Sequence, residues 1–442
     1  MTYKSLIVTI VVFLALGAGI GFFLFRSTPT TTKDTPEATQ PDDFFPVSKE
    51  APEPARRSTT STTTPVNDSS SAIEGGTVSN TESTPRPLSL RQLVARPSTG
   101  AFVFARGKAT VVRYVEKETG HVSEIATDEK VPTKVTNTTL PKSFQVWWGP
   151  QGESLVLQLF ADKINTVQTI FANIVVAPAA SSSTQTQKNT VSYVPSYRTQ
   201  VGTLEGATLP TSIQAITLSP DHRRAFYLLD ANGGTLGIIS DVIQSAATRG
   251  QLPVFQSSFQ EWLPEWSSAD TITLTTRASA GVPGYAYFLH PSTKQFEKVL
   301  AGIPGLTSRA DPRATVLLYS KSDRTGLALY LYDLATHTKT AFPIQTLPEK
   351  CVFSTKEAIV YCAVPEAIPA ASYPDAWYQG VVQFTDNLWR VDLESGESQL
   401  LVQPTKIRRD QEIDAIDLML APDERALVFR NKRDNSVWML AL

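Results

Sequence analysis

The sequence has little histidine and little cysteine: 4 His and 2 Cys occur among 442 residues. His121, His222, His290 and His337 each stand alone beside turn-forming residues, which favours surface turns over a catalytic or metal cluster. The short motifs of zinc proteases, serine hydrolases, P-loop nucleotide binders and EF-hands are all missing from the chain. We therefore expect no metal and no cofactor, although a site assembled only by folding stays open.

An excess of positive charge is also missing. Lys and Arg number 40 against 42 Asp and Glu, which gives a net charge of -2. Proteins that bind nucleic acid carry a basic patch or stripe that neutralises phosphates. The densest basic spots here are three isolated pairs, Arg56-Arg57, Arg223-Arg224 and Arg408-Arg409, which we interpret as solvated surface residues. The composition therefore excludes nucleic acid as an expected partner.

One long hydrophobic run stands at the beginning of the chain. Residues 6–25 are all apolar or small apart from one Thr, and Lys4 and Arg26 flank them. About 20 helical residues at about 1.5 Å each span the hydrocarbon layer of a bilayer. Because no A-x-A-like cleavage site follows, residues 1–26 predict an uncleaved transmembrane anchor, with a cleaved signal peptide as the alternative.

Residues 27–87 are rich in Ser, Thr and Pro and poor in large apolar residues, as in STTSTTTP at 58–65. Such a composition cannot bury enough surface to pack, so we expect a disordered linker. The sequence DDFFP at 42–46 is open to a second interpretation as a docking peptide.

A repeated turn organises residues 88–442. It reads WGPQG at 148–152, LSPD at 218–221 and LAPD at 420–423, each before an apolar strand-like run. A unit of about 40–50 residues built from short strands is typical of a β-propeller. Looser versions bring the count to seven; they lie at residues 96–99, 266–270, 309–312 and 353–356. The fold class is therefore all-β, a propeller of about seven four-stranded blades, with six or eight as alternatives.

The last unit stops early, because its strand at 436–440 lies next to the chain's last printed residue, Leu442. A blade without its outer strand leaves an open sheet edge. We expect residues 88–93 to supply that strand from the start of the domain, or else a three-stranded blade.

The LSPD turn and the strand after it resemble the WD40-like repeats of TolB-type propellers, whose hallmark is W-S-P-D-G before a strand. The region from residue 347 to residue 380, with its two cysteines, is also similar to singly anchored bacterial surface propellers. The resemblance covers residues 88–442 and implies a bacterial envelope protein. It implies no activity, because one propeller fold serves enzymes, binders and scaffolds.

The two cysteines, Cys351 and Cys362, flank the turn of unit six. In a hairpin centred on residues 356–357 they face each other, with Cα atoms about 4.5 Å apart at a non-hydrogen-bonded position. We predict a structural disulfide; free buried thiols and a metal or redox pair are the alternatives. A disulfide implies an oxidising compartment. The head then lies outside the cytoplasm and the N-terminus inside it.

Unit six also carries the longest insertion, from about residue 364 to residue 386. Aromatic and carboxylate side chains on a long loop suit a sugar or peptide site, since Trp and Tyr offer large stacking area at low entropic cost. The alternative is a loop folded over the blade with its aromatics buried. The candidate binding residues are Tyr373, Asp375, Trp377, Tyr378, Gln379 and Asp386.

Two further features have structural interpretations. Trp262 and Trp266 lie four apart, so on a strand they share a face, and we expect packing between blades rather than a ligand platform. Residues 177–189 form a polar insertion that predicts a disordered loop.

The sequence thus favours a binding or scaffolding module that is anchored to the membrane through residues 6–25. Its partner would be an envelope protein or polysaccharide. The alternative is a propeller-type hydrolase or lyase acting on glycans or peptides, with carboxylates such as Asp375 and Asp386 meeting at the central channel. A structural spacer without a ligand is a third reading.

Overall fold

The computed structural model describes residues 88–161, 166–176, 201–231, 233–241, 251–323, 326–407 and 409–442. The predicted anchor, the linker and the insertion at 177–189 lie outside these residues. Among the described residues, no helix has the length and apolar character needed to cross a membrane.

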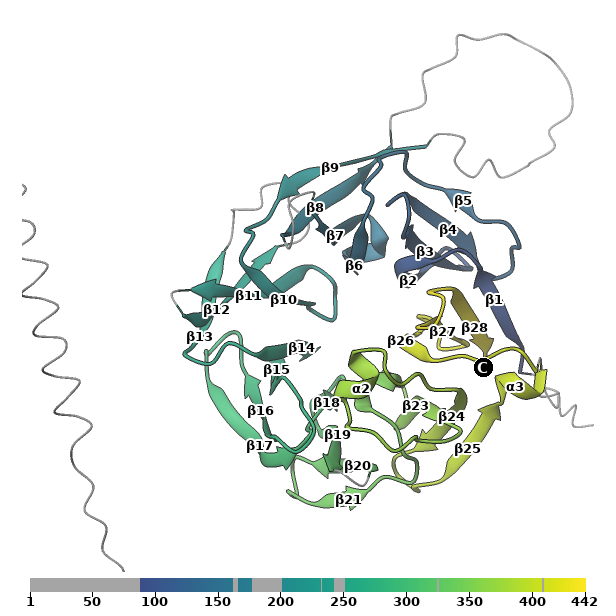
Figure 1. Ribbon diagram of the computed structural model, residues 1–442. Helices are drawn as coiled ribbons and strands as arrows, with labels where there is room; N and C mark the ends of the chain where they lie inside the picture. The colour runs from purple at the N-terminus through teal and green to yellow at the C-terminus, as the bar shows by residue number, and fades with distance from the viewer. Residues whose placement is uncertain are drawn as a thin grey trace, which may run out of the picture. The chain divides into compact units, whose positions relative to one another are not determined.

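The described strands form seven separate four-stranded antiparallel sheets. The sheets follow one another around a central axis as the blades of a propeller (Figure 1). The all-β, seven-bladed architecture expected from the repeated turn is therefore confirmed.

In blades one to three, strands follow chain order from the centre outward. Blade one is β2 (Ser98–Arg106), β3 (Ala109–Glu116), β4 (Val122–Ala126) and β5 (Thr133–Lys134). Blade two is β6 (Ser143–Trp148), β7 (Ser154–Phe160), β8 (Val167–Val175) and β9 (Thr203–Thr208), with the 3-10 turn η1 (Pro150–Gly152). Blade three is β10 (Ile213–Leu218), β11 (Arg224–Ala231), β12 (Gly234–Asp241) and β13 (Leu252–Ser257).

Blades four to six repeat this order. Blade four is β14 (Trp262–Ser268), β15 (Thr271–Thr276), β16 (Pro283–Leu289) and β17 (Phe296–Pro304). Blade five is β18 (Ser308–Ala310), β19 (Val316–Asp323), β20 (Gly326–Asp333) and β21 (Lys339–Ala341). Blade six is β22 (Cys351–Phe353), β23 (Ile359–Pro365), β24 (Asp386–Asp392) and β25 (Ser398–Val402), with η2 (Pro348–Lys350), α2 (Asp375–Tyr378) and α3 (Pro404–Ile407) around it.

Blade seven joins the two ends of the domain. It contains β26 (Ala415–Leu420), β27 (Ala426–Asn431) and β28 (Val437–Ala441), and its outer strand is β1 (Leu90–Val94). Leu90 pairs with Leu440 and Gln92 pairs with Trp438 in antiparallel register. The predicted closing strand is therefore confirmed. It covers the sheet edge that the sequence alone would leave open.

The repeated turn occupies one place in six blades, between the first and second strands. Its tightest copies pass through the left-handed region, with φ of 52° at Gln151, 59° at His222 and 60° at Glu424. The turn at residues 96–99 is different, because it links β1 to β2 rather than two strands of blade one. The prediction for unit one was wrong in this detail: the inner hairpin of blade one turns at Gly107 and Lys108, with no copy of the phrase.

The core lies between neighbouring blades. One cluster joins Phe226 and Leu228 of β11 to Trp262, Trp266 and Ile272 of blade four. Trp262 and Trp266 are 8% and 4% exposed, as expected for two residues on one face of a strand that packs between blades. This blade-on-blade packing fixes the inner strands around the axis, and the inner strands carry the site described next.

Candidate functional site

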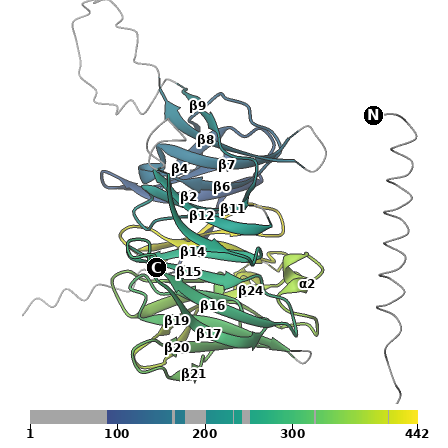
Figure 2. The same cartoon turned by 90° about the vertical axis from the view of Figure 1, so that its left-hand side faces the viewer.

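The insertion of unit six joins β23 to β24 and contains the single helical turn α2. In side view α2 lies at one face of the propeller (Figure 2). Helical spacing places residues three or four apart on one side, so Asp375, Tyr378 and Gln379 share a face, while Ala376 and Trp377 point to another. The insertion therefore has an outward half and an inward half.

The inward half is packed. Tyr373 is fully buried and Trp377 is 5% exposed, in a cluster with Leu327, Leu347 and Phe384. The Tyr373 hydroxyl donates to the Pro369 carbonyl at 2.7 Å. Asp386 is also fully buried. Tyr373 and Trp377 are therefore buried, as in the alternative interpretation of a loop folded over its blade, and Asp386 is buried at the start of β24.

The outward half lines a pocket of about 740 Å³. That volume falls in the range of small-molecule and peptide-side-chain sites, about 300–1,000 Å³. Asp375, Tyr378 and Gln379 form one wall, and the other walls come from blades two to five, mostly from their inner strands, and from η2 of blade six. The remaining lining residues are Trp147, Ile216, Thr217, Leu263, Pro264, Glu265, Thr275, Arg277, Ala278, Thr307, Ser308, Arg309 and Glu349.

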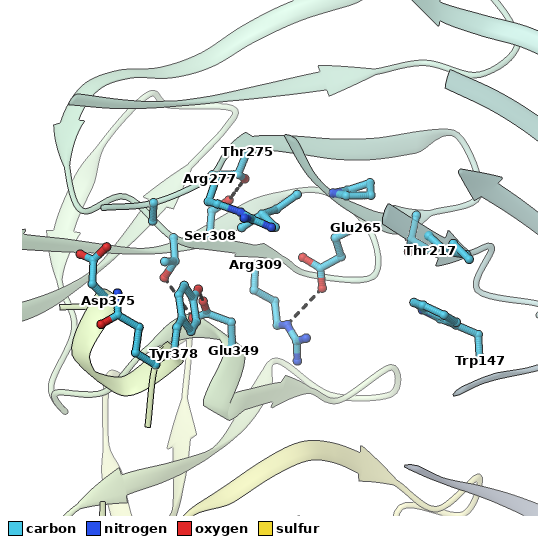
Figure 3. A pocket seen from close by; sticks show the side chains of 16 residues that line it. Trp147, Thr217, Glu265, Thr275, Arg277, Ser308, Arg309, Glu349, Asp375 and Tyr378 are labelled. Carbon is cyan, nitrogen blue, oxygen red and sulfur yellow. Dashed lines mark hydrogen bonds and ion pairs between the residues drawn. The ribbon is translucent and has the colours of Figure 1, made fainter. Parts of the chain in front are cut away.

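An acid–base pair spans the middle of this pocket. Arg309 Nε lies 3.0 Å from Glu265 Oε1, with side chains 29% and 32% exposed, and Figure 3 shows the pair between Tyr378 and Trp147. Arg309 also donates to the carbonyl of Cys351, so the disulfide strand holds the guanidinium in place. Burial raises the pKa of Glu265, an effect that Arg309 opposes and the nearby charge of Glu349 strengthens.

Glu349 is the second carboxylate of the pocket. It accepts hydrogen bonds from the Tyr378 hydroxyl and from Thr307 Oγ1, the latter at 3.0 Å. Burial raises the pKa of Tyr378 well above its usual value, and the charge of Glu349 adds to the effect. The phenol therefore stays protonated and donates. Thr307 is itself held by Ser320, whose Oγ lies 2.9 Å from Thr307 Oγ1.

The rim of the pocket carries the third carboxylate and the second arginine. Asp375 Oδ2 accepts from the backbone N–H of Ala280 at 2.6 Å, which ties α2 to blade four. Arg277 Nε lies 3.1 Å from Glu261 Oε2, and both side chains are mostly exposed. The pocket thus presents the hydrogen-bonded carboxylates of Glu265 and Glu349, the exposed guanidinium of Arg277 at its rim, and aromatic side chains at its sides.

The described lining residues include no histidine and no cysteine, and among the described residues no cluster of three or more His, Cys, Asp or Glu suits a metal ion. The histidines lie in or beside turns, as expected. His222 has a packing role there, because its Nδ1 lies 2.9 Å from the Trp148 carbonyl and so connects blade three to blade two.

Sequence reasoning missed Trp147, Glu265, Arg309 and Glu349, although a signal for most of this site exists. The residue just before the one that opens the repeated turn is Trp147 in blade two, Thr217 in blade three and Glu265 in blade four, and all three line the pocket. Side chains alternate along a strand, so this column faces away from the packed residues that open the turn. Arg309 of blade five belongs to the same column, because Ala310 pairs with Leu317 as Trp148 pairs with Leu155. Glu349, in η2, follows no such column.

The disulfide prediction is confirmed. Cys351 and Cys362 are bonded, their Cα atoms lie 4.1 Å apart, and the two residues pair directly across β22 and β23.

No family model matches this chain, and no curated protein matches it either. Solved structures do. An oligogalacturonate lyase from Vibrio parahaemolyticus shares 9% identity over 80% of this chain and 97% of its own, with a TM-score of 0.46. The tricorn protease shares 11% identity over 81% of this chain and 34% of its own, with a TM-score of 0.45. TolB from Acinetobacter baumannii shares 10% identity over 77% of this chain and 79% of its own, with a TM-score of 0.39. At TM-scores below 0.5, these likenesses carry no argument about the pocket or its function.

Proposed function

We propose that this chain is a binding module whose ligand enters the pocket beneath α2. The observation that carries the proposal is the lining itself: aromatic faces, paired acids and bases, and hydroxyl groups converge from the inner elements of five blades. Pockets of this kind hold a ligand by stacking and by a few fixed polar groups.

The state of the carboxylates supports binding over catalysis. Glu265 is paired with Arg309, Glu349 accepts from two hydroxyls, and Asp375 accepts from a backbone N–H. A general base or nucleophile needs a reactive lone pair directed at the substrate. Groups already held by partners serve better as fixed recognition points.

The partner we propose is an extended segment of an envelope protein or polysaccharide. Stacking on Trp147 and Tyr378, with hydrogen bonds to Gln379 and the hydroxyl groups, suits both sugars and peptides. The disulfide supports an oxidising compartment. The predicted anchor at residues 6–25, with a cytoplasmic N-terminus, would hold the propeller on the extracytoplasmic side of the membrane.

The test is a binding screen with the full-length chain in detergent against arrays of bacterial cell-wall oligosaccharides and envelope-derived peptides. For any ligand bound by the wild type, we expect Trp147→Ala and Tyr378→Ala each to weaken binding about 10-fold or more. Tyr285→Ala is the matched control, because Tyr285 is 36% exposed and lies outside the lining. Equal binding by all four proteins would place the site elsewhere.

A second candidate function is a hydrolase or lyase acting on glycans or peptides. It rests on Glu265, whose pKa is raised by burial and by the charge of Glu349, as in sites where one carboxyl acts as an acid beside a second carboxylate. Incubation of a captured glycan or peptide with wild type and with Glu265→Gln distinguishes the two functions. Turnover by the wild type that Glu265→Gln abolishes supports the enzyme; an unchanged ligand supports binding.

A further inference from the structure

Directly behind the pocket wall, Lys350 is buried together with two aspartates. The lysine ends η2 and is fully buried, as are Asp386 and Asp414. Its Nζ lies 2.6 Å from Asp414 Oδ1 and 2.8 Å from Asp386 Oδ2, and it donates to the Ala415 carbonyl at 2.9 Å. An amine and two carboxyl groups are thus held at contact distance without access to water.

The surroundings of this cluster are aromatic. Lys350 Nζ lies 5.1 Å from the ring centre of Trp377 and 5.4 Å from that of Phe384. Both rings belong to the inward half of the unit-six insertion, and both residues are at most 5% exposed. Such an environment disfavours separated charges and favours products that are neutral.

Asp414 is arranged as an electrophile. The backbone N–H of Phe384 donates to Asp414 Oδ2 at 3.0 Å, and the indole N–H of Trp377 lies between Oδ2 at 3.0 Å and Oδ1 at 3.1 Å. Two N–H donors on one carboxyl oxygen stabilise the negative charge that forms there when a nucleophile adds to the carboxyl carbon. The lysine lies at the other oxygen, Oδ1.

Asp386 is arranged to carry a proton. Its Oδ2 contacts Lys350 and accepts from the backbone N–H of Ala415 at 2.7 Å. Its Oδ1 is buried, and among the described residues it has no hydrogen-bond partner. Burial raises the pKa of Asp386 to about 6, with the charge of Asp414 adding to the rise and Lys350 opposing it.

We propose that Lys350 and Asp414 join covalently, forming an intramolecular isopeptide cross-link between the lysine Nζ and the aspartate Cγ, with Asp386 as the proton carrier. This inference is independent of the proposed function of the pocket.

The reaction balances within the three residues. The Lys350 ammonium gives one proton to the Asp386 carboxylate and becomes a neutral amine. The amine attacks Cγ of Asp414, and the negative charge passes to Oδ2 under the two N–H donors. Asp386 then returns its proton to Oδ1, the attacking nitrogen gives up a second proton to the same oxygen, and Oδ1 leaves as water while one hydrogen stays on the amide nitrogen. Ammonium and carboxylate have become amide and water, and Asp386 ends as it began, so no oxidant or activated group is required.

The cross-link would join two blades. Lys350 precedes β22 of blade six and Asp414 precedes β26 of blade seven, 64 residues further along the chain. Blade seven is also the blade that β1 closes. The bond would therefore fix the last blade to its neighbour at the inner end, opposite the closing strand.

Intact-mass measurement of the full-length chain, purified in detergent and then denatured and reduced, tests this proposal. We expect a mass about 18 Da below that of the sequence, the loss of one water. Trypsin should leave a branched peptide that joins residues 340–356, uncleaved at Lys350, to residues 410–425, and fragmentation should locate the branch at Asp414.

The variants separate the roles. We expect Lys350→Arg and Asp386→Asn to show the full mass of their sequences. Asp414→Asn should lose ammonia instead of water and reach the same final mass as the cross-linked wild type. Lys432→Arg is the control: Lys432 lies 4.1 Å from the ring centre of Trp377 but outside the reacting groups, so the deficit should persist.

Wild-type protein with the full mass of its sequence would overturn the proposal and leave the cluster as a non-covalent ion pair. A water loss located at Asp386 would overturn the assignment of the electrophile. The wild-type measurement decides the matter even where a variant fails to fold.

Discussion

Glu349 and Lys350 are adjacent in the chain and face opposite environments. Glu349 lies in the wall of the open pocket, with the Tyr378 hydroxyl and Thr307 as partners. Lys350 points into a site with no exposed surface, between Asp386 and Asp414. Each region combines acids, a base and an aromatic residue of α2, so their composition is nearly the same.

Access to water separates the two regions. In the pocket, Arg309 and Glu265 keep about a third of their surface exposed, and a ligand can replace the water they hold. In the buried cluster no water is left to replace, so each charge depends on its protein partners. The pocket can therefore exchange water for a ligand, whereas the groups of the buried cluster keep the same partners.

The largest effect is expected from Lys350→Met, which removes the proposed cross-link and leaves two buried carboxyl groups without the lysine that partners both. Removal of one partner from a buried ion pair costs about 3–5 kcal/mol of unfolding free energy. Urea unfolding measures it. Arg277→Met is the pocket-side control, because its ion pair with Glu261 is mostly exposed, and exposed pairs contribute about 0–1 kcal/mol. An equally small loss of unfolding free energy for Lys350→Met and Arg277→Met would contradict the difference between the buried cluster and the open pocket.

The next effect concerns the disulfide, since Cys351 follows Lys350 and its carbonyl accepts from the pocket residue Arg309. The bridge closes a loop with a sequence separation of 11. We expect the double variant Cys351→Ser, Cys362→Ser to lose about 3 kcal/mol of unfolding free energy by the chain-entropy estimate. Wild type under reducing conditions should lose a similar amount. An unchanged midpoint in both experiments would show that packing alone holds this corner.

Stability should also depend on pH in opposite directions in two blades. Asp386 has its pKa raised from 3.8 to about 6, so its protonated form is favoured in the folded state. Its contribution is complete below about pH 4 and is lost as the pH rises to about 6, a change of roughly 2–3 kcal/mol. Asp386→Asn should abolish this decline in pH-dependent urea unfolding.

Glu124 of blade one gives the reference for that measurement. Burial pushes its pKa upward, but hydrogen bonds from Arg106 and Arg113 outweigh burial and lower the pKa to about 2. Its contribution is therefore present above about pH 4.5 and is lost as the pH falls towards 2. Glu124→Gln should remove the acid limb of the profile and leave the decline between pH 4 and 6 intact. A decline that Glu124→Gln removes instead would contradict the assignment to Asp386.

The smallest effect on stability is expected at Tyr378, which is 40% exposed. Tyr378→Phe removes the hydroxyl that donates to Glu349, and thermal unfolding should register a loss of about 0.5–1.5 kcal/mol. Tyr285→Phe, at another exposed tyrosine, should leave stability unchanged. A loss at Tyr378 as large as that of Lys350→Met would mean that the pocket wall is part of the core.

Much of the fold could be predicted because it repeats. The turn recurs with the same residue types, the period sets the blade size, and an incomplete last unit requires a strand from the other end. The disulfide followed from two cysteines placed at equal distances from one hairpin turn. Each of these inferences uses a short-range pattern. The pattern misplaces one hairpin, because the turn at residues 96–99 follows the closing strand β1 of blade seven and does not lie between the first two strands of blade one.

The pocket and the cluster could be predicted only in part. The unit-six insertion was found by its length, yet sequence alone could not divide it into an inward half with Trp377 and an outward half with Tyr378, because a single helical turn decides that. Trp147 and Glu265 occupy the same place in the repeat, which is a signal in the sequence, but only the closed ring of blades brings them to one pocket. Lys350 resembles any surface lysine in the sequence, and only the fold brings Asp386 and Asp414 to it.

The closing strand β1 carries a consequence for biosynthesis. Its partner β28 is made after all the other described strands of the propeller, and Leu90 of β1 pairs with Leu440 of β28. Until the residues between them have been synthesised, β1 has no partner strand, and the edge of blade seven that β1 will cover stays open. Pairing at such sequence separation is slow, and exposed edges in that interval invite aggregation. We therefore expect the nascent chain to need a chaperone until β1 and β28 have paired.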